Sequence, residues 1–293
     1  MALTRRDVVV PVPSTRYVIV HYHIFKNGGS TPEGILESQF RQNFATLHGP
    51  QPGSTLDASH LEEFLLAHPG ISAVSSHHLR YPKPTIRHTV LFDCCFLRDP
   101  LDRLHSFYTY LRQINSTDPL SLQARRPTPS EFMEQLVRDA LNQVSNVQVT
   151  LLATGGAFTR PASERDLERA TSIVLDMAMP GVVEMFDESL VTAEQFLKPA
   201  FPMIRLDYLP RNTTRPLRTT PDEKREDLLR TWGSVLYQRP AQLNQMDLEL
   251  VARTRREVSR RLDLVSSAEK RVAVKSHPCR IAKPKLNAVG ADL

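Results

Sequence analysis

The chain has 293 residues, of which 41% are hydrophobic and 24% charged, a balance that excludes a wholly disordered protein. This length predicts one α/β domain, placed at residues 16–265, with an N-terminal extension (1–15) and a C-terminal tail (266–293). Residues 268–293 carry six basic and two acidic side chains, so most of the net charge of +5 belongs to the tail. The nearly neutral remainder argues against a nucleic-acid-binding protein.

The tail lacks aromatic residues and apolar periodicity, which predicts a disordered end, the alternative being a docking or substrate-guiding arm. The cysteines are the adjacent pair Cys94 and Cys95 and the tail residue Cys279, with no metal-site spacing. Buried free thiols are expected, which suit a reducing compartment. Neither a signal peptide nor a run of ~18 apolar residues is present, so no transmembrane segment is predicted.

Two apolar segments predict buried strands, at residues 16–24 and 89–97. The first is followed by a glycine loop (25–30) and a predicted helix over 31–47, with Thr31 as cap and Pro32 in the first turn. Between the two strands, the sequence predicts a helix over 57–68, capped by Asp57 or Ser59, and a short apolar run at 71–75. After the second strand, Asp99 can cap and Pro100 can open a helix over 101–114.

The second half is mainly helical in pattern. We expect an exposed loop at 115–129, a polar linker at 210–221 and a short strand at 181–184. Helical patterns occupy residues 130–144, 164–177, 187–196, 222–235 and 241–264. Strands that alternate with helices in the first half predict a P-loop-like parallel sheet of about four or five strands, flanked by helices, with a helical C-terminal half.

The glycine loop is the sharpest local feature. It contains Lys26, Asn27, Gly28, Gly29, Ser30 and Thr31. Adjacent glycines let the backbone approach a ligand, and the following helix directs its N–H groups and positive dipole end at an anion. These are properties of a phosphate site, although the lysine precedes both glycines, unlike the P-loop NTPase motif. An ordinary tight turn is the alternative.

A second polar segment follows the other strong strand. Arg98 emerges at its carboxyl end, where open α/β sheets bind ligands, and Arg103 and Ser106 share a helix face. An arginine with a hydroxyl suits phosphate binding, because the guanidinium presents a planar set of donors. The alternative is a surface ion pair of Arg98 with Asp99, or of Asp102 with Arg103.

Together these segments resemble the sulfotransferases that use 3′-phosphoadenosine-5′-phosphosulfate (PAPS). The resemblance is closest to the heparan and chondroitin carbohydrate sulfotransferases and their bacterial relatives. In that family a Lys-Thr-Gly-Gly-Thr-Ser-like loop holds the 5′-phosphosulfate, and an Arg-Asp-Pro-x-x-Arg-x-x-Ser-x-Tyr-like segment holds the 3′-phosphate. The second segment is matched by Arg98, Asp99, Pro100, Arg103, Ser106 and Tyr108.

Looser likenesses extend the resemblance over residues 16–264. Residues 146–152 look like an Asn/Gln-containing stretch that precedes a helix in the family, and residues 181–190 look like its Gly-x-x-Glu-x-Phe-Asp-Glu-Ser-Leu segment. Asn27 replaces the usual threonine and Pro32 removes an N–H, which puts individual cradle contacts in doubt. The animal Golgi enzymes carry a membrane anchor that is not seen here, which points to a bacterial-type cytoplasmic enzyme or to a shortened chain.

The resemblance implies in-line transfer of a sulfuryl group to a hydroxyl acceptor, a sugar or glycoconjugate, without a metal. Lys26 would stabilise the leaving oxygen, and the 3′-phosphate would bind Arg98 and Ser106. In the carbohydrate enzymes a histidine after the second short strand takes the proton, and His77 and His78 occupy that place. His77 is preferred, with His78 in reserve, because alternation directs the two oppositely. A structural or solvated histidine pair is the alternative.

Other residues have weaker claims. Glu33 and Glu37 are further candidates for the base, although pairing with lysine or exposure to solvent is the favoured role. His21 and His23 share a strand face but lack the further ligands of a metal site, so they are interpreted as strand histidines. Trp232 and Tyr237 are expected to pack, the alternative being stacking on a sugar.

Two rival functions remain open at this stage. A P-loop kinase-like phosphotransferase predicts Mg²⁺ ligands and affinity for ATP, but the Gly-Lys-Ser/Thr ending of its loop is absent. A non-catalytic sulfotransferase fold predicts binding of PAP, the desulfated product, without turnover. The acceptor and the oligomeric state are not readable from the residues.

Overall fold

A five-stranded parallel sheet forms the centre of the molecule. The computed structural model describes residues 15–51, 53–114, 119–125, 128–208 and 221–264. Within these residues the strand order is β2-β3-β1-β4-β5, with β1 paired to β3 and β4. The strands are β1 (Arg16–Tyr22), β2 (Phe44–Thr46), β3 (Ala73–Ser76), β4 (Thr89–Leu97) and β5 (Met179–Val182). All carboxyl ends therefore meet at one edge, and the predicted α/β architecture is confirmed.

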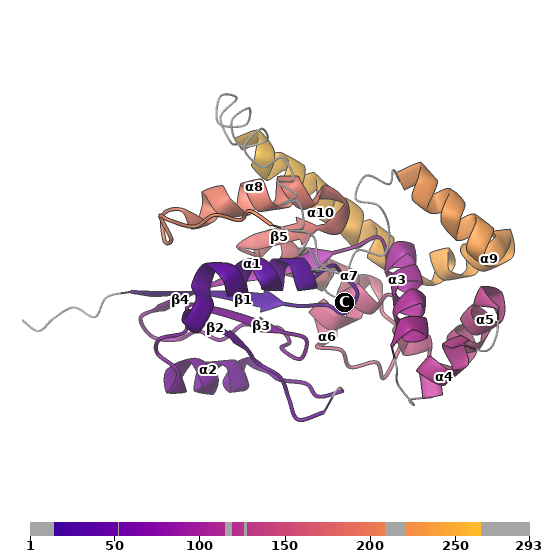
Figure 1. The fold of residues 1–293 in the computed structure, drawn as a ribbon, viewed down its shortest axis with the longest axis horizontal. Coiled ribbons are helices and arrows are strands. Elements are labelled where there is room, and N and C mark those ends of the chain that lie inside the picture. The colour runs from indigo at the N-terminus through magenta and orange to yellow at the C-terminus, as the bar shows by residue number, and fades with distance from the viewer. Residues whose placement is uncertain (1–14, 52, 115–118, 126–127, 209–220, 265–293) are drawn as a thin grey trace, which may run out of the picture.

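Helices cover both faces of this sheet (Figure 1). Side chains alternate along β1, so Ile19 faces a core with α1 (Ser30–Phe40) and α8 (Phe186–Leu197). Val18 and Val20 face the opposite core. That core is built on α2 (Ala58–Ala67), α6 (Val147–Thr154), α7 (Glu164–Asp176) and α10 (Gln245–Leu264). The apolar strand segments are thus buried on both sides, as is typical of a parallel sheet.

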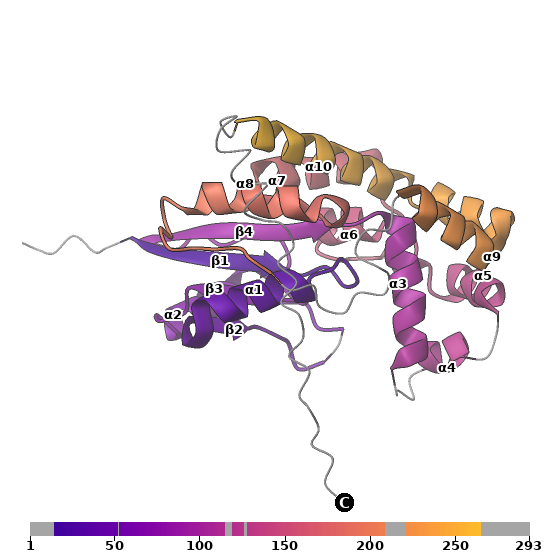
Figure 2. The same cartoon turned by 45° about the horizontal axis from the view of Figure 1, so that its top comes forward.

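A separate helical group lies beyond the carboxyl ends of the strands, as Figures 1 and 2 show. It consists of α3 (Pro100–Gln113), α4 (Pro119–Arg125), α5 (Pro129–Asp139) and α9 (Pro221–Leu243). Its core contains Leu104, Phe132 and Trp232, of which Trp232 is only 1% exposed, and Tyr237 packs against it. The expected packing role of both aromatic residues is confirmed. This group closes the edge of the sheet at which ligands of α/β proteins bind.

Two of the three predicted helix caps are confirmed. The Asp57 carboxylate caps α2, and the Asp99 carboxylate caps α3, which Pro100 opens. The Thr31 cap was wrong: α1 begins one residue earlier, with Gly29 at the cap position and no side-chain cap bond. Backbone N–H groups at this end are therefore not occupied by a cap side chain.

The helix predicted over 31–47 was too long. Arg41 adopts a positive φ of 48°, which ends α1 at Phe40, and a short turn (η1, Arg41–Asn43) leads into β2. A strand of three residues is too short to show periodicity, and it forms because it pairs with β3. The loop expected at 115–129 was likewise wrong over α4, and α6 was not predicted as a helix.

Some expectations concern residues outside the described part. They include the extension before residue 15, residues 210–220 of the predicted linker, and the tail after residue 264 with Cys279. Cys94 and Cys95 are buried and free, as expected, and burial raises the pKa of the Cys95 thiol to about 12. In the part of the chain that the structure describes, every helix is too short or too polar to cross a membrane.

Candidate functional site

The glycine loop connects β1 to α1 at the carboxyl edge of the sheet. Lys26 and Gly28 both adopt positive φ values, 66° and 67°. Gly28 packs against the side chain of Val183 in the turn η3 (Val183–Met185), and a Cβ at Gly29 would overlap the imidazole of His23. The glycines therefore allow the loop to approach the end of β1 and the segment after β5 closely. Gly28 also permits the positive φ value at its position.

The Asn27 side chain points into the protein interior, away from the phosphate site that the sequence predicts. Its side chain is 1% exposed and donates hydrogen bonds to the Phe96 carbonyl (2.9 Å) and to the Gln148 side-chain oxygen (2.7 Å). A direct side-chain contact with a nucleotide, as the sequence suggested, is therefore not formed in this arrangement. Asn27 instead anchors the loop to β4 and α6.

Arg98 joins the two predicted motifs. Its guanidinium donates to the Lys26 carbonyl (Nη1, 3.1 Å) and to the Asp102 carboxylate (Nη2, 2.9 Å). Lys224 of α9 lies 3.5 Å from the same carboxylate. Ser106 is buried one helical turn beyond Asp102, on the same face of α3. The structure thus brings Lys26 and Arg98 together at one edge, and Asp102, not Asp99, is the partner of Arg98.

Arg103 has a different place. It is 2% exposed and donates from Nη2 to the Gln143 carbonyl (2.6 Å) in the turn η2 (Leu141–Gln143). Burial lowers the pKa of its guanidinium to about 10. Arg103 therefore links α3 to η2 and does not share a phosphate site with Ser106.

A cluster of buried amide and carboxylate side chains joins the glycine loop and the Arg98 segment to α6 and α10. This cluster was not predicted from the sequence. Gln148 accepts from the Asn27 amide and from the Arg98 N–H (3.0 Å), and donates to the Arg98 carbonyl (2.8 Å). Asp247 of α10 accepts from the N–H groups of Gln148 (3.0 Å) and Val149 (2.8 Å), which begin α6. The available signal was a glutamine inside an apolar run. Such hydrogen-bonded buried polar groups fix the relative positions of the elements they join.

The Lys26 ammonium lies over the ring of Tyr110, 4.5 Å from its centroid. Burial, together with the nearby Arg98 charge, lowers the pKa of Lys26 to about 8. Tyr110 belongs to α3, so the lysine bridges the loop and the helical group. A cation–π contact holds it without neutralising its charge.

His77 lies directly after β3, beside β1. Its Nδ1 is 3.1 Å from the His23 carbonyl oxygen, and because a carbonyl only accepts, Nδ1 carries the proton. Nε2 of the neutral ring is therefore the basic nitrogen. Burial and the neighbouring His23 lower the pKa of His77 to about 4, so the ring is neutral at pH 7. This tautomer and charge state suit proton abstraction.

His78 is bound in the opposite sense. The Gly49 N–H donates to its Nδ1 (2.8 Å), which places the proton of the neutral ring on Nε2. The basic nitrogen of His78 is thus already occupied. The geometry favours His77 over His78 as the base, as the sequence suggested.

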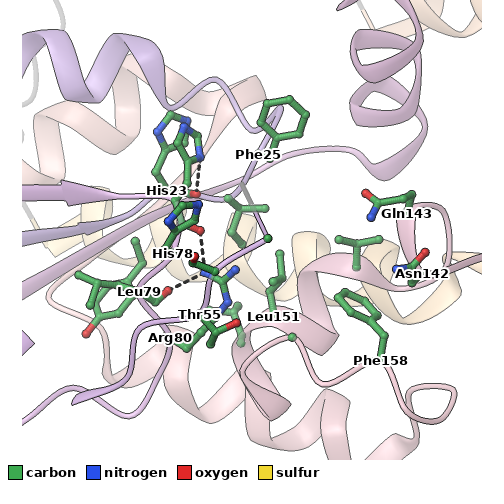
Figure 3. A pocket seen from close by; sticks show the side chains of 18 of the residues that line it. His23, Phe25, Thr55, His78, Leu79, Arg80, Asn142, Gln143, Leu151 and Phe158 are labelled. Carbon is green, nitrogen blue, oxygen red and sulfur yellow. Dashed lines mark hydrogen bonds between the residues drawn. The ribbon is translucent and has the colours of Figure 1, made fainter. Parts of the chain in front are cut away.

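Both histidines border a cavity of about 700 Å³ (Figure 3). Aromatic rings, amides and hydroxyls line it, and neither Asp nor Glu is among its lining residues. The lining includes Phe25, Thr55, Arg80, Tyr110, Asn142, Gln143 and Phe158. This volume falls in the range of small-molecule sites. Its pairing of ring faces with hydrogen-bonding groups suits a polyhydroxylated ligand.

The strand histidines belong to the same region. His21 and His23 share a face, with ring centroids 5.1 Å apart, as predicted. Glu33 was expected to pair with lysine or to be exposed, which is wrong: its Oε2 accepts from the Ser75 hydroxyl (2.8 Å) and lies 3.5 Å from His23 Nδ1. Glu37, one turn further along α1, is exposed. Within the described residues, groups of three or more metal-ligating side chains are absent.

Replacing Gly29 with alanine is expected to destabilise the protein. The new methyl group would overlap the buried His23 imidazole, so we expect a loss of about 1–3 kcal/mol in the free energy of unfolding, measured by urea titration. Gly70→Ala is the matched control, since a Cβ there meets no atom within 4 Å. Equal stabilities of the two variants would contradict the close packing of loop and strand.

No family model matches the chain. It is similar to a protein from Archaeoglobus fulgidus described as uncharacterized, with 26% identity over 246 residues, covering 80% of this chain and 94% of that protein. The likeness thus extends over most of the chain, beyond the glycine loop and the Arg98 segment. It carries no statement about activity.

Proposed function

We propose that this protein is a sulfotransferase that moves a sulfuryl group from PAPS to a hydroxyl of an acceptor, a carbohydrate. One observation carries the proposal: Arg98 donates to the Lys26 carbonyl, so the glycine loop and the start of α3 form one basic site beside His77. The two segments lie 72 positions apart in the chain. A binding site for two phosphate groups of one nucleotide requires this proximity.

The charges of the site suit a polyanionic nucleotide. Lys26, Arg98 and Lys224 contribute cations, and the Asp102 carboxylate pairs with Arg98 and Lys224. The N-terminus of α1 has no side-chain cap, and the positive end of its dipole favours an anion. We assign the 5′-phosphosulfate to the loop residues Lys26 and Gly28–Thr31, and the 3′-phosphate to Arg98 and Ser106. Protein cations supply this charge, so the proposal includes no metal.

The proposed reaction is an in-line displacement. The acceptor oxygen forms a bond to sulfur while the bond between sulfur and the bridging oxygen of the 5′-phosphate breaks. Nε2 of His77 accepts the hydroxyl proton, and the Lys26 ammonium stabilises the charge that develops on the leaving oxygen. The products are the sulfate ester and PAP.

The cavity beside His77 is the proposed acceptor site. His77 lies on its wall together with Arg80, Asn142 and Gln143, which can donate hydrogen bonds to sugar oxygens. Phe25 and Tyr110 face the same cavity and contact the Lys26 ammonium. Acceptor and leaving group would therefore meet between His77 and Lys26. The buried free thiols agree with a place in the cytoplasm, which we include in the proposal.

Calorimetric titration of PAP tests the nucleotide site. We expect micromolar binding to the wild type, no comparable binding of ATP, and a loss of about 2 kcal/mol or more in Arg98→Ala, because a charge-assisted contact to phosphate is removed. Ser106→Ala should lose about 1 kcal/mol, the value of one neutral donor. Arg138→Ala is the control, since Arg138 pairs with Asp139 on the exposed face of α5.

Three results would contradict the proposal. Failure of the folded wild type to bind PAP removes the nucleotide site. Equal affinity for ATP and PAP favours a kinase-like phosphotransferase. Binding of PAP without transfer to any hydroxyl acceptor favours a non-catalytic fold. Thermal unfolding of each variant shows whether an altered affinity reflects an altered site.

A further inference from the structure

A row of interacting side chains lies behind the proposed base. The His23 ring packs against the His77 ring with centroids 3.7 Å apart, and its carbonyl fixes His77 Nδ1. On its other side, His23 Nδ1 lies 3.5 Å from Glu33 Oε2. Thus His23 contacts the base by both ring and main chain, and the Glu33 carboxylate lies beside its Nδ1.

Glu33 is itself held in place by hydrogen bonds. The Ser75 hydroxyl donates to its Oε2 (2.8 Å) and therefore accepts from His21 Nδ1 (3.0 Å). His21 and Ser75 are both almost fully buried. His23 and Ser75 together lower the pKa of Glu33 to about 2, although burial opposes them, so the carboxylate is charged at neutral pH.

We infer that Glu33, which lies beside the stacked His23 ring, is the charge partner of His77: its carboxylate stabilises the imidazolium that forms when the base takes a proton. This inference rests on the proposed function. Glu33 touches neither the cavity nor the loop lysine, and so it is distinct from the base. Glu33 would act like the carboxylate that stabilises a catalytic imidazolium in other enzymes, here across an intervening stacked ring.

The other charged or titratable groups around His77 cannot replace Glu33. His23 and His48 face its ring from β1 and from the segment after β2, and both disfavour positive charge on it. His78 binds Gly49, and Arg80 donates to the His77 carbonyl. Among the groups of the described residues that act on the His77 imidazole, the Glu33 carboxylate and the His23 carbonyl favour a proton on it.

The test compares Glu33→Gln with Glu37→Gln in the full chain. Gln keeps the shape of Glu33 but removes its charge, whereas Glu37 lies exposed on the same helix. The first readout is the ¹⁵N spectrum of His77, assigned with His77→Asn. Recorded as a pH titration, the spectrum should give one midpoint for the wild type and Glu37→Gln and a lower midpoint for Glu33→Gln, because the nearby carboxylate is gone.

The second readout is the pH dependence of kcat. We expect Glu33→Gln to lower kcat about 10-fold at pH 7 and to move the acid limb to lower pH, because the carboxylate that raises the pKa of His77 is gone. The acceptor KM should stay within about twofold of the wild type. Glu33→Asp, which restores the charge on a shorter side chain, should recover part of the loss.

An unchanged His77 spectrum and acid limb in Glu33→Gln would overturn the inference. Complete loss of transfer with an unchanged spectrum would also overturn it, since Glu33 would then be the base. The spectral titration needs neither PAPS nor acceptor. A protein that keeps the expected spectral change but fails to bind PAP would therefore disprove the proposed function while supporting the link from Glu33 to His77.

Discussion

His77→Ala is expected to lower kcat for sulfuryl transfer by about 10²–10⁴-fold, the contribution of a positioned general base. The affinity for PAP should be unchanged, because His77 borders the cavity proposed for the acceptor and its contact with the glycine loop is with the Phe25 ring. Steady-state kinetics with a carbohydrate acceptor, together with calorimetry of PAP, measure the two quantities separately.

His78→Ala provides the comparison. His78 also borders the cavity, but its Nδ1 accepts from Gly49, so its removal should loosen that loop and cost far less activity. Equal losses in the two variants would show that the tautomer argument is wrong. Full activity of His77→Ala would leave the acceptor proton to another group, and Glu33→Gln would then become the decisive variant.

Lys26→Met is expected to lower kcat by about 10²–10³-fold, the usual effect of removing one preorganised group that stabilises transition-state charge. Methionine keeps the apolar stem against Phe25 and Tyr110 while removing the ammonium. Lys198→Met is the control, because Lys198 is a half-exposed lysine of the segment after α8, paired with Glu194.

The pH profile of the wild type follows from the same two residues. Lys26 must be protonated and has a pKa of about 8, so the rate should fall as pH rises through that value. His77 must be neutral and has a pKa of about 4, so the rate should fall as pH drops through that value. The alkaline limb should disappear in Lys26→Met. Its persistence there would assign the limb to a different group.

Local sequence was sufficient for the elements that carry strong, long patterns. Thr89–Leu97 is a strand with the bounds that its apolar run predicted, and the Asp99-Pro100 pair begins α3 as its capping chemistry predicted. The same local reasoning failed for β2 and α4. A three-residue strand and a seven-residue helix are too short to show periodicity. Such elements form because neighbouring strands and helices contact them.

For the candidate site, the sequence by itself determined which residue types stand at the two strand ends: the Lys26–Thr31 loop, Arg98, and the His77-His78 pair. Parallel strands place their carboxyl ends at one edge, so the meeting of these segments could be predicted. Only the tertiary structure decided which of these side chains face the carboxyl edge of the sheet and which pack in the interior. Asn27 turns inward to Gln148, His77 and His78 carry their protons on different nitrogens, and Glu33 lies against His23. These outcomes depend on donors and acceptors brought from distant elements, α6, α1 and the loop at Gly49, whose positions no local pattern encodes.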